Sequence, residues 1–118
     1  MLELLRRWDI LQPERCRLWD NGDVEVMLGG KLEMTANSVF VFDAQDHAFI
    51  QAAVQEAVGA RNWIFSLCIY QPNRFHSIVT VPGDKPGDMP YHVRQARGDV
   101  AAQVLLGAYL QALENYER

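Results

Sequence analysis

The chain has 118 residues, 49% of them hydrophobic and 22% charged, with a formal net charge of −4 at pH 7. This composition predicts a single globular domain over residues 1–118 and excludes an intrinsically disordered chain, which would be less apolar and more highly charged. The acidic balance argues against direct nucleic-acid binding, because proteins that bind DNA or RNA usually carry a basic patch.

The two cysteines, Cys16 and Cys68, lie in apolar segments and do not form a CxxC motif. We expect both to be buried free thiols in a reducing cytoplasm, because a small secreted domain would carry more cysteines in disulfides. The first residues lack the apolar stretch of a signal peptide, and no apolar run is long enough to cross a membrane. The sequence therefore predicts a cytoplasmic protein without membrane contact.

Residues 2–11 predict a short amphipathic helix. Leucines and Trp8 recur there at helical spacing, and charged residues occupy the other side. Pro13 ends the pattern, because proline cannot continue a helix.

Residues 15–28 predict a hairpin whose turn contains Asn21-Gly22. A two-residue loop would pair Asp20 with Asp23 and place two like charges opposite each other. A three-residue loop, with the glycine in the left-handed region, gathers apolar side chains on one face and opposite charges on the other. We therefore predict the pairs Cys16 with Val26, Leu18 with Val24, and Arg17 with Glu25, with Cys16 and Leu18 buried and the last pair salt-paired and facing solvent.

Two further strands are predicted before the next helix. Gly29-Gly30 turns the chain, and residues 31–35 alternate so that Leu32 and Met34 should point inward. Residues 39–42, with the sequence VFVF, predict a fourth and fully apolar strand.

Residues 43–61 give the clearest helical pattern. Asp43 or Asp46 can cap its start, and Gly59 is expected to end it. One face forms an apolar stripe that consists of Ile50, Ala53, Val54, Ala57 and Val58.

The remaining pattern is a second hairpin and a final helix. Residues 63–70 and 75–81 are apolar strands around a turn at Pro72, and residues 99–118 form a helix whose apolar side is broad enough for several neighbours. Taken together, the elements predict an α+β fold in which an antiparallel sheet, made of a hairpin or meander plus a second hairpin, packs with about three helices.

No catalytic or metal-binding motif is present. The histidines at 47, 76 and 92 lie on different elements without ligand spacing, and Ser77 follows His76 directly, so the two should point to opposite faces of a strand. Dinucleotide-binding and phosphate-binding glycine motifs are also missing. We therefore expect no enzyme activity, no metal and no cofactor.

The connection over residues 82–90 and the segment after it form the predicted functional surface. Arg94 and Arg97 would make a two-point clamp for phosphate or carboxylate if the last helix had already begun there. The aromatic side chains nearby could stack on a base, but Asp84 and Asp88 would repel a phosphate. A stiff polar connector and a protein-binding loop remain open as alternatives. The candidate binding residues are Asp84, Lys85, Asp88, Tyr91, His92, Arg94 and Arg97.

If these arginines are structural, the Trp19 and Arg15/Arg17 face of the first hairpin is the next place to look for a site.

The last two-thirds of the chain resembles small phage and prophage proteins with an α-β-α sandwich layout. The matching segments are AAVQEAVGARNWIFSLCIY, FHSIVTV and AAQVLLGAYLQALE, while residues 1–40 fall outside the match. Only Pro90 could serve as the proline that usually precedes the closing helix. The resemblance implies a mobile-element origin and a binding role against host defences, as in anti-CRISPR proteins and nucleotide-signal sponges.

Two functional hypotheses follow. The first is a non-enzymatic protein in the host cytosol that binds and blocks a host protein, for example a defence-system component, as an anti-CRISPR-type inhibitor does. The alternative is a protein that sequesters a nucleotide-like signal through Arg94 and Arg97. Both hypotheses leave a homodimer open.

Overall fold

The computed structural model describes residues 1–83, 89 and 91–116, and within them the side chains of residues 70, 91 and 93–97 lie outside the described part. The α+β fold class is confirmed, with helices and two antiparallel sheets. In chain order the elements are α1 (Leu2–Leu11), β1 (Cys16–Leu18), β2 (Asp23–Leu28), β3 (Lys31–Asn37), α2 (Ala44–Ala60), β4 (Ile64–Gln71), β5 (Arg74–Val81), β6 (Tyr91–Gly98) and α3 (Ala101–Tyr116).

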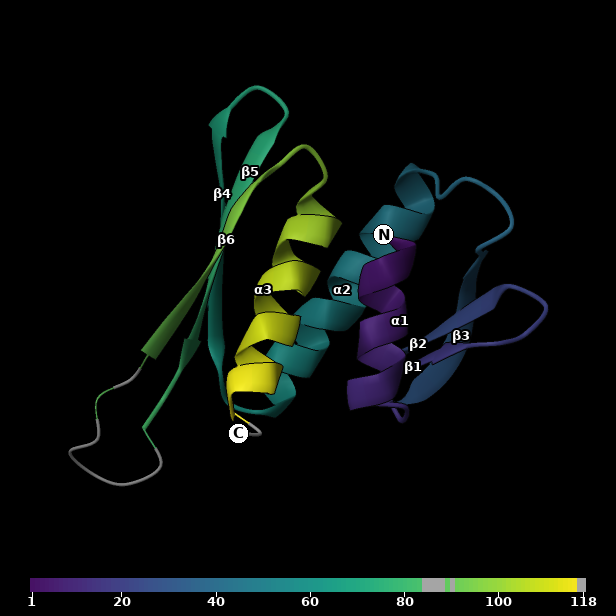
Figure 1. Cartoon of the computed structure of the whole chain (residues 1–118), viewed down its shortest axis with the longest axis horizontal. Helices are drawn as coiled ribbons and strands as arrows, with labels where there is room; N and C mark the ends of the chain where they lie inside the picture. Colours follow the sequence, from purple (N-terminus) through teal and green to yellow (C-terminus); the bar gives the residue numbers. More distant parts are fainter. Residues whose placement is uncertain (84–88, 90, 117–118) are drawn as a thin grey trace.

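The helices lie between the two sheets (Figure 1). One sheet has the strand order β1-β2-β3 and the other has the order β4-β5-β6. The α3 helix packs on β5 and β6 and also against α1 and α2, while α2 contacts β2 and β3. The sheets therefore form the two ends of the molecule, and each turns one face away from the helices.

The register of the first hairpin is confirmed. Cys16 pairs with Val26, Arg17 with Glu25, and Leu18 with Val24. Gly22 has a φ of 95°, as the three-residue loop requires. Cys16 is buried, Leu18 is half-buried and Arg17 is exposed, so the apolar face points to the core as predicted.

Arg17 and Glu25 lie opposite each other but do not form the expected ion pair. The Nε of Arg17 donates to the Pro13 carbonyl oxygen at 3.4 Å, and its guanidinium lies 5.8 Å from the centre of the Trp19 ring. Glu25 instead accepts a hydrogen bond from the indole Nε1 of Trp19. The Trp19 indole contacts both Arg17 and Glu25, and these two contacts take the place of an ion pair between them.

The prediction that Leu32 and Met34 point inward is wrong. Val24 pairs with Ala36 but Glu25 pairs with Met34, so Thr35 is an extra residue in β3. Such a bulge reverses the alternation of side chains on its two sides. Met34 therefore shares the outer face with Glu25 and is 67% exposed. Leu32 lies opposite Met27 on the same face, and it is half-buried without packing on the core.

The predicted fourth strand at residues 39–42 is also absent: the chain turns and then runs irregularly into α2. The Asn37 side-chain oxygen accepts from the Val39 N–H at 3.0 Å, and its carbonyl oxygen accepts from the Phe40 N–H at 3.0 Å. These local bonds satisfy backbone groups that a strand would have offered to a neighbour. Apolar content alone misled the sequence prediction here.

The second helix confirms its predicted cap and stripe. Asp43 accepts from the Asp46 N–H at 2.8 Å, and Asp46 accepts from the Asp43 N–H at 3.0 Å, which is a reciprocal capping box. All five residues of the predicted apolar stripe are fully buried. The helix passes the expected end at Gly59, and Asn62, with a φ of 59°, takes the left-handed position after it.

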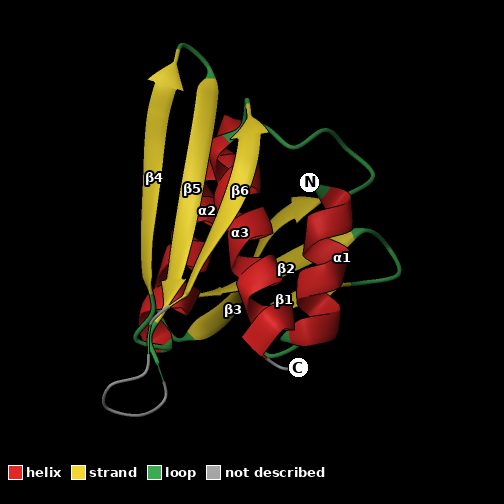
Figure 2. Cartoon of the chain, turned by 60° about the vertical axis from the view of Figure 1, so that its left-hand side comes forward, coloured by secondary structure: helices red, strands yellow, loops and turns green. Residues whose placement is uncertain are grey.

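The second predicted hairpin forms from β4 and β5, with Asn73 in the left-handed region at its turn. Ser77 is buried, and its hydroxyl donates to the Ser66 carbonyl oxygen at 2.9 Å. Cys68 is exposed, so the prediction of a buried thiol is wrong for this residue and holds for Cys16. Cys68 lies opposite His76, on the face of the sheet that turns away from the helices (Figure 2).

The sequence analysis missed β6. Residues 91–98 pair with β5, with Tyr91 opposite Val81 and Arg94 opposite Ile78, and α3 begins only at Ala101. The premise of helical spacing between Arg94 and Arg97 is therefore wrong. Arginine, glutamine and alanine favour helices in isolation, and the pairing with β5 overrides that preference.

The closing helix lies at the centre of the core, as its broad apolar side predicted. Its Tyr109 hydroxyl donates to the Gln12 side-chain oxygen at 2.9 Å, and the same oxygen accepts from the Trp8 Nε1 at 3.0 Å. This buried bond network joins α3 to α1, which also meet in an ion pair of 2.6 Å between Arg7 and Glu114. No helix in the described ranges is long and apolar enough to cross a membrane.

Candidate functional site

The structure places the predicted binding residues on β6 and the connection before it. Asp84, Lys85 and Asp88 lie outside the described residues, so that part of the prediction stays untested. Tyr91, Arg94 and Arg97 are in β6, where the structure describes their backbone and not their side chains.

His92 is the one predicted binding residue whose side chain is described. It is exposed, and its Nδ1 lies 2.8 Å from the Thr80 hydroxyl on β5. The backbone around it forms a strand, so no helix start stands at Arg94 to supply free N–H groups for an anion. The predicted anion site therefore lacks the backbone N–H donors that a helix start would have supplied.

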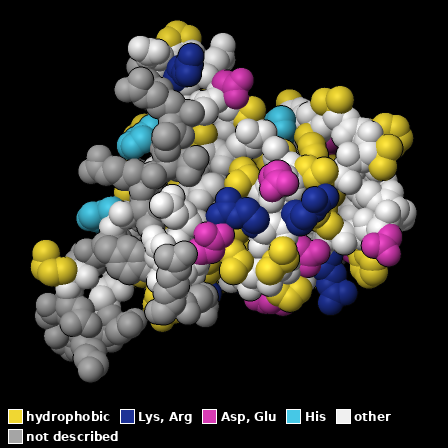
Figure 3. Space-filling view, viewed as in Figure 1, with side chains coloured by type: hydrophobic (Ala, Val, Ile, Leu, Met, Phe, Trp, Pro, Cys, Tyr) yellow, Lys and Arg dark blue, Asp and Glu magenta, His cyan; other side chains and the backbone are white. Residues whose placement is uncertain are grey.

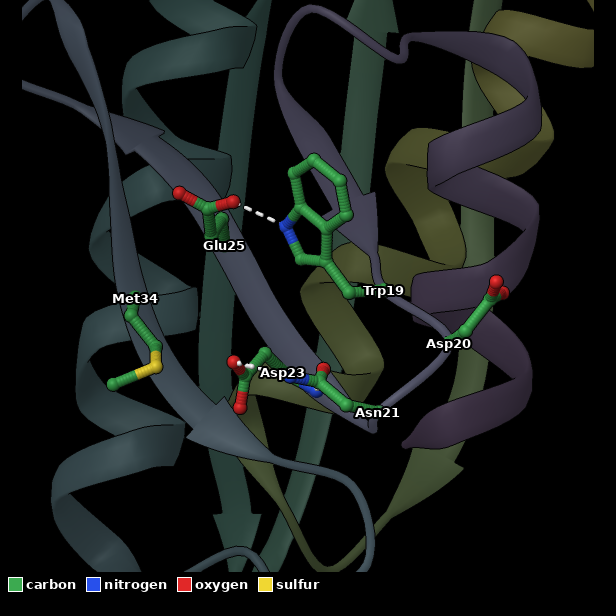
Figure 4. A pocket seen from close by; sticks show the side chains of 6 residues that line it. All are labelled: Trp19, Asp20, Asn21, Asp23, Glu25 and Met34. Carbon is green, nitrogen blue, oxygen red and sulfur yellow. Dashed lines mark hydrogen bonds between the residues drawn. The ribbon is translucent and has the colours of Figure 1, made fainter.

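A different surface is hollowed, at the end of the molecule formed by the first sheet (Figure 4). The hollow is shallow, about 500 Å³ in volume, and lies on the outer face of the first hairpin. Its lining combines apolar side chains with acids and an amide, and consists of Trp19, Asp20, Asn21, Asp23, Glu25 and Met34.

Trp19 is held at this hollow by polar contacts at its edge and face. Its Nε1 donates to Glu25, and the guanidinium of Arg17 lies over its ring. Figure 4 shows the indole beside Glu25, with Met34 beyond it. The bulge at Thr35 is what brings Met34 to this face, opposite Glu25. A half-exposed indole thus stands over the outer face of the sheet.

The aspartates at the hairpin tip differ in how they are held. Asp23 accepts from the Asn21 amide at 3.1 Å and from the Asn37 amide at 2.8 Å. Asp20 is exposed, and its carboxylate has no partner among the residues that the structure describes. In Figure 4 its carboxylate points toward α1. The tip therefore offers negative charge on both sides of Trp19.

A second hollow adjoins the first, and Trp19 and Asp20 line both. It lies between α1, the hairpin tip and the start of the connection from β3 to α2, and Ile10 and Val39 are part of its wall. Ile10 is exposed, and in the connection Val39, Phe40 and Val41 are 74%, 73% and 93% exposed. Figure 3 shows hydrophobic side chains over this connection, on the right-hand side of the molecule.

We use the name hairpin surface for this continuous region. It consists of Ile10, Trp19, Asp20, Asp23, Glu25, Met34 and Val39–Val41. Soluble monomers rarely expose large apolar side chains in a group, and such groups rimmed by polar residues usually mark interaction sites. The apolar members come from α1, the hairpin tip, β3 and the connection before α2, which the fold brings together.

The groups on the hairpin surface are suited to binding. Its carboxylates attract cations or basic side chains, and its apolar side chains can be covered by a partner. The histidines, cysteines and acids in the described ranges do not form a group that could hold a metal ion. Burial raises the pKa of the Cys16 thiol to about 12, with Asp9 contributing in the same direction, so this cysteine stays protonated in the core.

Sequence reasoning named Trp19 only as a second choice, placed Ile10 in the first helix, and assigned Met34 and Val39–Val41 to strands. Met34 and Val39–Val41 read as core residues because an alternating or continuous apolar run usually is buried. One available signal was Asn37-Ser38, a pair of turn-forming residues between two apolar runs. Comparisons with models of protein families, with curated proteins and with solved structures give no match.

Proposed function

We propose that the protein is a non-enzymatic binding module that holds a protein partner on the hairpin surface. The exposure of Val39, Phe40 and Val41 beside Trp19 is the observation that carries this proposal. Tryptophan and other large apolar side chains supply much of the binding energy at protein interfaces, where they fill pockets of the partner.

The charges of the surface suggest the chemistry of that partner. Asp20, Asp23 and Glu25 surround Trp19, and the whole chain is acidic. A partner segment with lysine or arginine beside apolar side chains would complement this arrangement. Because the acids are at the surface, they should speed association and set its salt dependence more than they raise affinity.

The resemblance to small phage and prophage proteins extends the proposal. On that basis the partner is a host protein, such as a defence-system component, and the chain blocks it stoichiometrically in the host cytosol. An anti-CRISPR-type inhibitor is one form of this activity. The hairpin surface lies mostly in the part of the chain outside the resemblance, so a binding test can support the surface without the phage origin.

The test begins with capture on the immobilised chain from a lysate of the organism that encodes it. The captured protein is identified, purified and titrated by calorimetry against the wild type and against a triple variant, Val39→Ser, Phe40→Ser and Val41→Ser. We expect the triple variant to bind at least about tenfold more weakly, which corresponds to about 1.4 kcal/mol. Met89→Ser, at an exposed apolar residue elsewhere, is the matched control and should bind as the wild type does.

A second pair of variants separates this proposal from the β6 surface. Arg94→Ala with Arg97→Ala should leave binding unchanged if the hairpin surface is the site. Loss of binding in that pair, with normal binding by the triple serine variant, would move the site to β6 and the 82–90 connection. A large thermal stabilisation by a nucleotide, absent in the arginine variant, would instead favour the signal-sequestering alternative.

A further inference from the structure

The outer edge of β4 is an unprotected strand edge. In the sheet order β4-β5-β6 this strand pairs only with β5, so its other side carries backbone groups without a strand partner in the described chain. The segment Ile64–Ile69 reads IFSLCI and contains no charged residue, no proline and no glycine. Ile64 and Ile69 are 64% and 70% exposed, and Ser66 and Cys68 are exposed between them. Figure 2 shows β4 at the margin of its sheet, with β5 on one side only.

The other strand edges carry the devices that normally prevent edge pairing, namely short length, charge and bulges. β1 has only 3 residues. β3 carries Lys31 and Glu33 and is interrupted by the bulge at Thr35. In β6 the register shifts opposite Phe75–Ser77, and the sequence contains two arginines. The register shift of β4 lies between Ile69 and Gln71, next to the turn, so Ile64–Ile69 stays regular.

We propose that the β4 strands of two copies of this chain pair antiparallel across a two-fold axis and join their β4-β5-β6 sheets into one continuous sheet. Such an arrangement satisfies the free backbone groups of both edges by the same contact, as a self-complementary dimer interface requires. It also keeps the helices of both copies on the same side of the joined sheet. The inference does not depend on the hairpin surface.

The absence of charge on Ile64–Ile69 lets this edge pair with its own copy without setting like charges opposite each other. Each chain has a net charge of −4, so two copies repel each other where their acids meet. The acids of the hairpin surface lie at the opposite end of the molecule from β4 (Figure 1). At ordinary ionic strength charges are screened beyond about 8 Å, so the uncharged β4 edges can approach without that repulsion.

Symmetry restricts the register of the pair. A two-fold axis perpendicular to the sheet must pass through a residue that lies opposite its own copy. For the regular segment Ile64–Ile69, a central position puts Ser66, Leu67 or Cys68 at the axis. In each case Ser66 and Cys68 lie close to the axis on the outer face, because β4 alternates and both are exposed there.

The test compares a lysine introduced on β4, at the proposed interface, with a lysine introduced on the neighbouring strand β5. With Ser66 or Leu67 at the axis, Ser66→Lys places two lysines about 5–8 Å apart, where like charges oppose strand pairing. With Leu67 or Cys68 at the axis, Cys68→Lys does the same. His76→Lys is the matched control on β5, because it lies opposite Cys68 on the same face. Its two lysines would be about three strand spacings, roughly 14 Å, apart in the dimer and largely screened.

Mass is measured by light scattering and by sedimentation over a range of concentrations, and circular dichroism checks the fold of each variant. We expect the wild type and His76→Lys to reach twice the chain mass of 13.5 kDa as the concentration rises. At least one of Ser66→Lys and Cys68→Lys should stay monomeric, and which one does reports the register. The dimer should be concentration-dependent, because a strand pair alone covers less than a standard interface of about 1,600 Å².

A spin label on Cys68, the exposed thiol, gives an independent readout. Its spectrum should show dipolar broadening that disappears when labelled chains are mixed with excess unlabelled chains. A wild-type chain that stays monomeric at the highest attainable concentration overturns the proposal. So does a dimer that survives both Ser66→Lys and Cys68→Lys, that is lost equally in His76→Lys, or that forms without broadening at Cys68.

Discussion

Gly22 lies so close to Val39 that a side chain at position 22 would clash with it. A β-carbon added to Gly22 would lie 2.7 Å from Val39 Cγ2 and 2.8 Å from the Asn37 side-chain oxygen. The Ser38 N–H also donates to the Gly22 carbonyl oxygen at 2.5 Å. The tip of the first hairpin thus holds the connection that exposes Val39, Phe40 and Val41, and it fixes the apolar part of the hairpin surface in place.

Replacing Gly22 by alanine should destabilise the protein by about 1–3 kcal/mol. Two causes add: the left-handed φ of 95° and the clash with Val39. Urea unfolding measures the change. Gly30→Ala is the matched control, because Gly30 has a φ of 87° but nothing within 4 Å of an added β-carbon. Equal losses in both variants would show that the Val39 contact contributes nothing.

The side-chain oxygen of Gln12 accepts two buried hydrogen bonds, so its loss should destabilise the protein more than loss of the Tyr109 hydroxyl. Gln12→Ala leaves the Trp8 Nε1 and the Tyr109 hydroxyl without a partner in the core, which should cost about 2–4 kcal/mol. Tyr109→Phe removes only one donor and should cost about 1 kcal/mol. Thermal or urea unfolding compares the two variants, and a larger loss in Tyr109→Phe would contradict this account.

Gly98 and Val104 should show coupled energetics. A β-carbon at Gly98 would lie 2.6 Å from Val104 Cγ2, so Gly98→Ala should be destabilising by about 1–3 kcal/mol. Val104→Ala alone removes buried methyl groups and should also destabilise. Together they relieve the clash, so the double variant should lose less free energy of unfolding than the two single losses added. Strict additivity in a double-mutant cycle would rule out this contact.

The thiol of Cys16 should make stability fall at alkaline pH. Its folded-state pKa is raised from 9.0 to about 12 by burial. Above pH 9 the unfolded chain loses this proton while the folded chain keeps it, so the stabilising contribution is complete below pH 9 and is lost as the pH rises toward 12. Cys16→Ala should show a shallower decline of unfolding free energy over this window. Parallel pH profiles in the two proteins would contradict the prediction.

The two cysteines should also differ in reactivity. Cys68 is exposed and should react with a thiol reagent in the folded protein, whereas Cys16 should react only after denaturant is added. Counting modified thiols by mass spectrometry before and after unfolding checks this. Fast modification of Cys16 in the Cys68→Ser variant would show that the core opens readily.

The sequence alone predicted the features that are set by residues only a few positions apart in the chain. The register of the first hairpin followed from pairing Arg17 with Glu25 and apolar residues with one another, because cross-strand neighbours are set by the loop length. The cap of α2 followed from Asp43 and Asp46, whose side chains reach backbone groups only three residues away. The buried stripe of α2 followed from helical periodicity.

Tertiary structure alone decided where the candidate surfaces lie. A bulge at Thr35 turned Met34 outward, and the bonds of Asn37 released Val39–Val41 from the sheet. Pairing with β5 made a strand of residues 91–98, whose composition favours a helix. In each case the deciding partner is a backbone group or packing surface on another segment, and the free energy of that contact exceeds a local preference of a few tenths of a kcal/mol per residue.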